Sequence, residues 1–221
     1  MTQLLRFAEA ASLQDLGIFV KRGRRINEQG IRLQAAGTVL AAWLPVMTPG
    51  SLNSTVPAVL GLRTMELAEP SRADVTVELG SISERLARLN PASMELPLPP
   101  ASINAPWTAV TPPRSGWEPR GRLADSTLRR TAEEGIAEVA EVVPETAGAH
   151  VVEQVRERVW GRAVEPAASD DVVAGTPIPA GAAFGAFSLG FLAEGGVSDV
   201  YSLGKWLRIT SAGGFILCRV G

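Results

Sequence analysis

Two side chains in this sequence stand out as candidates for nucleophilic or general-base chemistry, the single histidine His150 and the single cysteine Cys218. A Ser-His-Asp triad would need His150, but that residue lies just inside a predicted helix start and the chain has no G-x-S-x-G sequence. Cys218 lies in a terminal β-type run between Leu217 and Arg219, where a buried and unreactive thiol is expected. One histidine and one cysteine cannot supply the four ligands of a Cys/His zinc site. We therefore expect no catalytic residues of these classes, no metal and no cofactor.

Phosphate-binding loops are also absent from the sequence, which has neither G-x-x-x-x-G-K-[ST] nor G-x-G-x-x-G after a strand. Carboxylates remain as candidates. Four of them share one predicted helix at spacings that could hold a metal, namely Glu133, Glu134, Glu138 and Glu141. No partner motif accompanies them, so we predict a solvated acidic helix face, and we expect Asp170 and Asp171 to cap or solvate a loop. A carboxylate- or metal-dependent enzyme stays our third hypothesis.

The most distinctive local feature is a basic cluster at the end of the first predicted helix, formed by Lys21, Arg22, Arg24 and Arg25, with Arg32 shortly after. Cations are favoured at a helix C-terminus, where unpaired carbonyls carry partial negative charge. The leading interpretation is a helix end or a set of salt bridges between the two halves. The alternative is an anion-binding or nucleic-acid-binding site, because arginine presents a planar fork of donors to phosphate.

The charge distribution argues against nucleic acid as the main partner. The formal net charge is -2, with ten basic and eight acidic side chains in residues 1–90 and eleven and fifteen in residues 91–221. A winged helix would need a recognition helix at residues 180–193, which contain no Lys, Arg, Asn or Gln. We therefore expect a protein partner or self-association, and the charge difference makes electrostatic complementarity plausible chemistry for it.

Two tryptophans, Trp107 and Trp117, lie in a segment that holds eight of the sixteen prolines, between Pro91 and Pro119. Proline cannot donate to a helix or a central strand, so this segment is predicted to be extended. Because it also carries large apolar residues, we predict that it is pinned along the surface of both halves. Trp107 and Trp117 are equally candidates for core packing and for partner binding, since tryptophan is enriched at interfaces. The other three tryptophans are predicted to lie in the core.

The elements that position these residues follow from hydrophobic spacing. In the first half we predict a helix capped by Ser12, a hairpin of residues 31–34 and 38–46 turning at Ala35-Ala36-Gly37, strands at 59–67 and 75–77, and a helix at 81–89. In the second half we predict a helix from about Asp125 to Pro144, a helix capped by Thr146 and ending at Gly161, and strands at 197–203, 205–210 and 215–220.

One uncharged window, residues 172–193, is long enough to span a bilayer. Its prolines and glycines argue for a buried core helix over residues 180–193 instead, with Phe184, Phe187 and Phe191 on one face. The N-terminus MTQLLRFAEAASLQDLG has no secretory-signal pattern. We therefore expect a cytoplasmic protein without a membrane segment.

The predicted fold class is α+β, with antiparallel β meanders and about four to five helices. We divide the chain into a first α+β half at 1–90, a Pro-rich extended connector at 91–121 and a second α+β half at 122–221. Each half places a helix before a three-run meander, which leaves two interpretations open, an old duplication or two unrelated α+β pieces.

Several runs of this sequence resemble an uncharacterised group of actinobacterial proteins. They are LGIFVKRGRRINEQGIRLQ, PPRSGWEPRGRL, EGIAEVAE, VWGR, PAGAAFGAFSLGFL and GKWLRITSAGGFILCR. The group has no assigned activity, so the resemblance implies no catalytic residue. The sequence as a whole favours a non-enzymatic protein-interaction or assembly factor, with anionic-ligand or nucleic-acid binding at residues 21–32 as the alternative.

Overall fold

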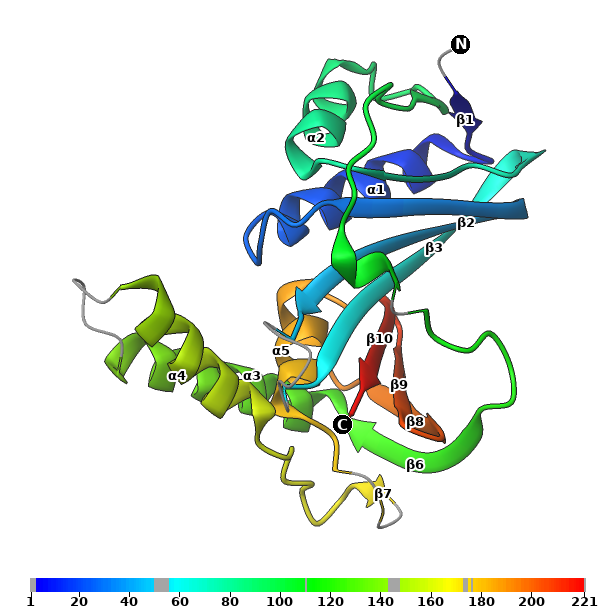
Figure 1. Ribbon diagram of the computed structural model, residues 1–221. Coiled ribbons are helices and arrows are strands. Elements are labelled where there is room, and N and C mark those ends of the chain that lie inside the picture. Colours follow the sequence, from blue (N-terminus) through cyan, green and yellow to red (C-terminus); the bar gives the residue numbers. More distant parts are fainter. Residues whose placement is uncertain are drawn as a thin grey trace. The chain divides into compact units, whose positions relative to one another are not determined.

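The protein is an α+β chain of two compact units, which confirms the predicted fold class (Figure 1). The computed structural model describes residues 3–49, 56–109, 111–142, 148–172, 175 and 177–220. Unit 1 comprises residues 1–45 and 62–111, and unit 2 comprises residues 46–61 and 112–221. Five α-helices and ten strands lie in the described part of the chain.

Unit 1 is a small antiparallel sheet with two helices that pack against each other, α1 and α2. Its strands β4, β2 and β3 are neighbours in this order, and β1 pairs with β5 in a separate two-stranded ribbon. The elements are β1 (Leu4–Arg6), α1 (Ala10–Gly23), β2 (Ile31–Met47), β3 (Ala58–Ser71), β4 (Asp74–Val77), α2 (Leu79–Arg88), β5 (Glu95–Pro97) and the 3-10 helix η1 (Pro106–Ala109). The far ends of β2 and β3 are assigned to unit 2.

The hairpin predicted within residues 31–46 is wrong, because β2 runs through this segment as one strand. Buried positions alternate through Ile31, Leu33 and Ala35 and resume, one residue out of phase, at Leu40 and Ala42. Gly37, between the two sets, has a φ of 65°. An extra residue with positive φ shifts the alternation in the way a β-bulge does, so the Ala-Ala-Gly turn signal marks an irregularity inside a strand.

Unit 2 contains the antiparallel strands β10, β9, β8, β6 and β7, which are neighbours in this order, and its helices α3, α4 and α5 pack against one another. The elements are β6 (Glu118–Ala124), α3 (Asp125–Val142), α4 (Ala149–Gly161), β7 (Asp171–Val172), α5 (Ala180–Ser188), β8 (Val197–Leu203), β9 (Trp206–Ser211) and β10 (Gly214–Arg219). The predicted helices and the final three-strand meander are confirmed, and α5 precedes that meander as α1 precedes β2, β3 and β4.

The helix α5 is a buried core helix, as predicted for the uncharged window. It presents six buried residues, and a Cβ at Gly185 would lie 3.1 Å from the Ile216 side chain of β10. Small residues therefore let this helix lie directly on the sheet. Among the described residues, no helix combines the length and the apolar character needed to cross a membrane.

Two predicted helix starts have different outcomes. The first helix begins at Ala10 with Glu9 as its N-cap residue and no side-chain capping bond, so Ser12 is not the cap. Thr146 lies outside the described residues. The Pro-rich segment contributes β5 and η1 to unit 1 and leads into β6 of unit 2.

Candidate functional site

The basic cluster lies at the C-terminal end of α1, where the amphipathic spacing of that helix places it. Four large apolar side chains of α1 are buried, namely Leu13, Leu16, Phe19 and Val20. The opposite face is consequently exposed and carries Lys21, while Arg24 and Arg25 follow directly after the helix. Exposed cations there interact favourably with the terminal helix carbonyls.

The members of this cluster differ in how they are partnered. Arg24 forms an exposed ion pair with Glu28, Nε to Oε1 at 3.3 Å. Lys21 and Arg25 have no ion-pair or hydrogen-bond partner for their side chains in the described part of the chain. These two cations are therefore available to an external anion.

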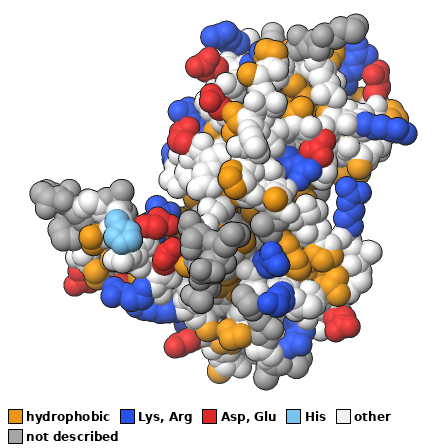
Figure 2. Space-filling view, in the orientation of Figure 1, with side chains coloured by type: hydrophobic (Ala, Val, Ile, Leu, Met, Phe, Trp, Pro, Cys, Tyr) orange, Lys and Arg blue, Asp and Glu red, His pale blue; other side chains and the backbone are white. Residues whose placement is uncertain are grey.

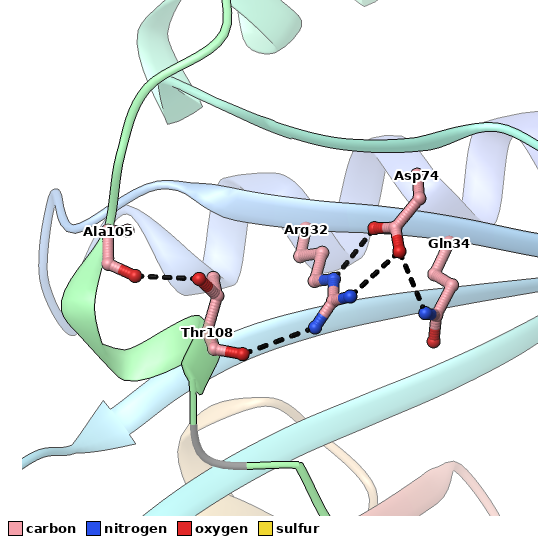
Figure 3. Close-up of polar contacts among 5 residues, drawn as sticks. All are labelled: Arg32, Gln34, Asp74, Ala105 and Thr108. Atoms are coloured by element: carbon pink, nitrogen blue, oxygen red, sulfur yellow. Dashed lines mark hydrogen bonds and ion pairs between the residues drawn. The ribbon is translucent and has the colours of Figure 1, made fainter.

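Arg32 is separated from the cluster by its own contacts (Figure 3). It lies on β2 and donates two hydrogen bonds, each 2.7 Å long, to the two carboxylate oxygens of Asp74 on β4. Its third nitrogen donates to the Thr108 carbonyl at 3.3 Å, and Gln34 also donates to Asp74 at 2.9 Å. The hydrogen bond with Asp74 raises the pKa of Arg32 despite its partial burial. Arg32 therefore connects β2 to β4 and to η1 through hydrogen bonds.

A groove of about 580 Å3 lies between α1 and α2 in unit 1. Its walls are mainly apolar, with Leu13 and Ile18 from α1 and Leu86 from α2. Lys21 and Arg24 also line the groove, and none of its described lining residues is an Asp or a Glu. This groove was not predicted from the sequence. One signal for it is present, because helical spacing places the apolar Ile18 on the polar face of α1, where its side chain is 50% exposed.

The two tryptophans of the Pro-rich segment occupy different environments. Trp107 is 6% exposed, and its indole N–H donates to the Gln29 carbonyl at 2.9 Å. Trp117 is half-buried in unit 2 and donates to the Pro113 carbonyl at 3.2 Å. The Arg208 guanidinium lies 4.9 Å from the Trp117 ring centre and 4.3 Å from that of Tyr201. Partner binding through either tryptophan stays a prediction, and Trp117 is the one with an accessible ring.

The carboxylates of α3 form a helix face with one strong ion pair. Glu138 accepts two hydrogen bonds of 2.6 Å from Arg162, which lower its pKa. Glu134 lies 4.0 Å from Arg130, while Glu133 and Glu141 are exposed. No three His, Cys, Asp or Glu side chains in the described part of the chain are grouped as a metal site would require.

Two further carboxylates organise the start of α3, and only one was singled out from the sequence. Asp170 accepts hydrogen bonds from the Ala124 and Ala167 amides and from Thr127 Oγ1, which confirms a capping role. Asp125 is 1% exposed and accepts from the Ala193 amide at 2.7 Å and from Ser198 Oγ at 2.5 Å. These bonds join residues distant in sequence, so no local pattern reveals them.

His150 and Cys218 lie where the sequence predicts them. His150 is exposed on α4, with its Nε2 3.1 Å from Gln154 Nε2. Cys218 is fully buried in β10, and burial raises the pKa of its thiol far above the usual range. Neither side chain is positioned as a nucleophile or base beside a groove.

The fold defined by these two units is that of DNA polymerase sliding clamps. The chain superposes over 99% of its length on a proposed DNA polymerase III beta subunit from Eubacterium rectale, with a TM-score of 0.61 and 8% identity. Sliding clamps from Caulobacter crescentus and Bacillus subtilis match with TM-scores of 0.54 and 0.53 and identities of 15% and 9%. The chain spans about 65% of the length of these clamps. At such identities the similarity establishes the fold.

Two sequence-family matches meet close to the boundary between the units at residue 111, although residues 46–61 lie in the first match and in unit 2. Residues 1–109 match a family described as a domain of unknown function (DUF8010), and residues 112–221 match another domain of unknown function (DUF8185). The two matches leave only residues 110 and 111 between them. No protein of curated function matches the sequence.

Proposed function

We propose that this protein is a non-enzymatic scaffold that works by binding other protein chains. The observation that carries the proposal is the sliding-clamp fold, which extends over 99% of the chain. The similar structures are named as sliding clamps of a DNA polymerase. The division of the sequence into two α+β halves with a connector at 91–121 is retained within this proposal as a prediction.

The contacts of the carboxylates and of the cysteine support a scaffold. Glu138 is engaged with Arg162, and Asp170 is engaged at the start of α3. The Cys218 thiol is buried and held in its protonated form. Their contacts stabilise the fold, and their groups do not converge on the groove between α1 and α2.

The test is affinity capture of the tagged full chain from a lysate of its source organism, with cross-linking and quantitative mass spectrometry. We expect a reproducible partner, or the chain itself, to be recovered in fixed stoichiometry. Within this proposal Trp117 is a candidate contact, so Trp117→Ala should reduce recovery, whereas the exposed control Glu194→Ala should not. Recovery of no partner, combined with turnover of a defined substrate, would contradict the proposal.

A second candidate function, nucleic-acid binding, is favoured by Lys21 and Arg25 at the end of α1, whose side chains have no partner in the part of the chain that the structure describes. Each phosphate contact contributes about 0.9 to the slope of log affinity against log salt. Replacing both residues with alanine should therefore lower that slope by about 1.8 for a short DNA duplex.

The matched control removes two exposed arginines elsewhere in unit 1, Arg72 and Arg88. Fluorescence anisotropy from about 50 to about 200 mM salt measures both variants. Equal losses in the two variants, or no binding by the wild type at the lower salt concentration, would exclude a site at Lys21 and Arg25.

A further inference from the structure

Gly17 on the lining of the groove between α1 and α2 has no role in the packing of its own chain. It lies in the middle of α1, its φ is not positive, and a Cβ built on it would meet no atom within 4 Å. By contrast, a Cβ at Gly23 of the same helix would lie 2.5 Å from the Leu44 side chain. Glycine inside a helix costs about 1 kcal/mol relative to alanine. Gly17 therefore leaves room for the backbone of another chain to approach α1 closely.

The lining beside Gly17 combines an exposed apolar side chain with cations. Ile18 is 50% exposed although it lies in the middle of a helix, and Leu86 of α2 lies on the other wall. Lys21 follows Ile18 by three positions and Arg24 follows Lys21 by three, so these side chains share one side of α1. The described lining residues include no Asp or Glu. Figure 2 shows acidic side chains elsewhere on unit 1, so their absence from the groove is a local property.

The two walls of the groove are joined within the lining. Gln14 of α1 donates a hydrogen bond of 2.9 Å to the Pro91 carbonyl in the loop after α2, and both residues line the groove. The shorter wall, α2, has 10 residues, which span about 15 Å or about three helical turns. The groove is therefore a preformed surface that matches three turns of a third helix.

We propose that the groove between α1 and α2 binds an acidic amphipathic helix of another protein, with the backbone of that helix against Gly17. This inference rests on the proposed protein-binding function and gives it a surface and a partner chemistry. The apolar face of the partner helix covers Ile18 and Leu86, and its carboxylates face Lys21 and Arg24. A nucleic acid would supply the negative charge but would leave Ile18 without an apolar partner.

The test is fluorescence anisotropy of the full chain with a labelled synthetic peptide of about 15 residues. This acidic peptide carries leucines on one helix face, glutamates beside them and alanines elsewhere. One matched peptide has lysines in place of the glutamates, and a second has serines in place of the leucines. We expect the acidic peptide to bind at least about tenfold more tightly than either, because each matched peptide loses the charge or the apolar part of the fit.

Gly17→Gln separates binding from folding. Glutamine is a better helix former than glycine, so stability in urea should be unchanged or higher. The new side chain occupies the space at the groove and should weaken binding of the acidic peptide by at least about tenfold. The matched control is Gly80→Gln on α2, which also has open space around its Cβ but does not line the groove, and it should bind like the wild type.

Charge reversal gives a second readout. Lys21→Glu with Arg24→Glu should lose the acidic peptide and gain the lysine peptide, which loss of folding cannot mimic. Arg72→Glu, at an exposed position outside the lining, is the control and should behave like the wild type. The inference is overturned if the wild type binds no peptide at about 1 mM, if it binds all three equally, or if Gly17→Gln keeps full binding. Tighter binding of a short DNA duplex than of the acidic peptide also overturns it. These outcomes leave the protein-binding function intact, whereas failure of the capture experiment would remove that function.

Discussion

The carboxylate of Asp170 offers a sharp test of how unit 2 is held together. It accepts three hydrogen bonds, from the Ala124 amide at 2.7 Å, from Thr127 Oγ1 at 2.8 Å and from the Ala167 amide at 2.7 Å. Ala124 directly precedes α3 and Thr127 is its third residue, so the carboxylate also lies at the positive end of a helix dipole. The side chain thereby connects the loop before β7 to the start of α3.

The magnitude follows from these contacts. A hydrogen bond to a charged group contributes about 1.5 kcal/mol or more, and a lost helix-end anion costs about 1 kcal/mol. Because the bonds share one carboxylate and are not additive, we expect Asp170→Ala to lower the free energy of unfolding of unit 2 by about 3 kcal/mol. Asp170→Asn keeps one acceptor oxygen and should lose about half as much.

The stabilisation by Asp170 should depend on pH in a definite direction. Burial raises the pKa of Asp170, but the bonds from Ala124, Thr127 and Ala167 outweigh it and lower the pKa below its ordinary value. The folded state therefore favours the ionised form, and its contribution is complete above the unfolded pKa of about 4 and lost as the pH falls through the folded pKa. The stability difference between wild type and Asp170→Ala should be constant near neutral pH and shrink below about pH 4.

The assay is hydrogen exchange at amides of residues 112–142, combined with urea denaturation at several pH values. Exchange reports unit 2 directly, which matters because a chain of two units need not unfold in one step. A difference below about 0.5 kcal/mol at neutral pH, the size of an ordinary surface substitution, would refute the capping argument. So would a difference that grows as the solution is acidified.

Three further predictions test single contacts. Arg32→Lys removes the two-bond fork to Asp74 and should destabilise unit 1 by about 1 kcal/mol in urea denaturation, whereas the exposed control Arg88→Lys should change little. A Cβ at Gly135 would lie 2.3 Å from a Trp160 ring carbon, so Gly135→Ala should cost about 1–3 kcal/mol and shift the tryptophan fluorescence. Gly80→Ala, with open space around its Cβ, is the matched helix control and should be neutral or stabilising. Cys218, with a pKa raised by burial, should resist a thiol reagent in the native protein and react on unfolding; native reactivity would contradict its placement.

The parts of the fold that could be predicted are those with strong local signals. The apolar stripe beginning at Leu128 predicts α3, and glycine-marked turns predict β8, β9 and β10. The error at β2 has a physical cause, because Gly37 permits a positive φ both in a hairpin turn and in a bulge. Local sequence cannot distinguish the two, since the outcome depends on the strands that pair alongside.

The candidate site was only partly predictable for a related reason. Arg32 follows the basic cluster closely in sequence, yet its partner Asp74 lies 42 residues further along the chain. Asp125 reaches its Ser198 partner across 73 residues. The groove between α1 and α2 likewise depends on packing between helices separated by most of unit 1. Residue types show which side chains could bind an anion, whereas long-range pairing decides which of them remain able to do so.

Long-range pairing also explains why the net charge of the chain does not describe its surface. In the first half, the fork to Asp74 neutralises Arg32, and Glu28 lies against Arg24, while Lys21 and Arg25 stay unpaired among the described residues. On α3, Glu138 forms an ion pair with Arg162, whereas Glu133 and Glu141 are exposed. Exposed charges without partners keep their full attraction for an opposite charge, because no internal bond must break first. Among the described residues, the exposed charges left without an internal partner are therefore positive at the end of α1 and negative on α3.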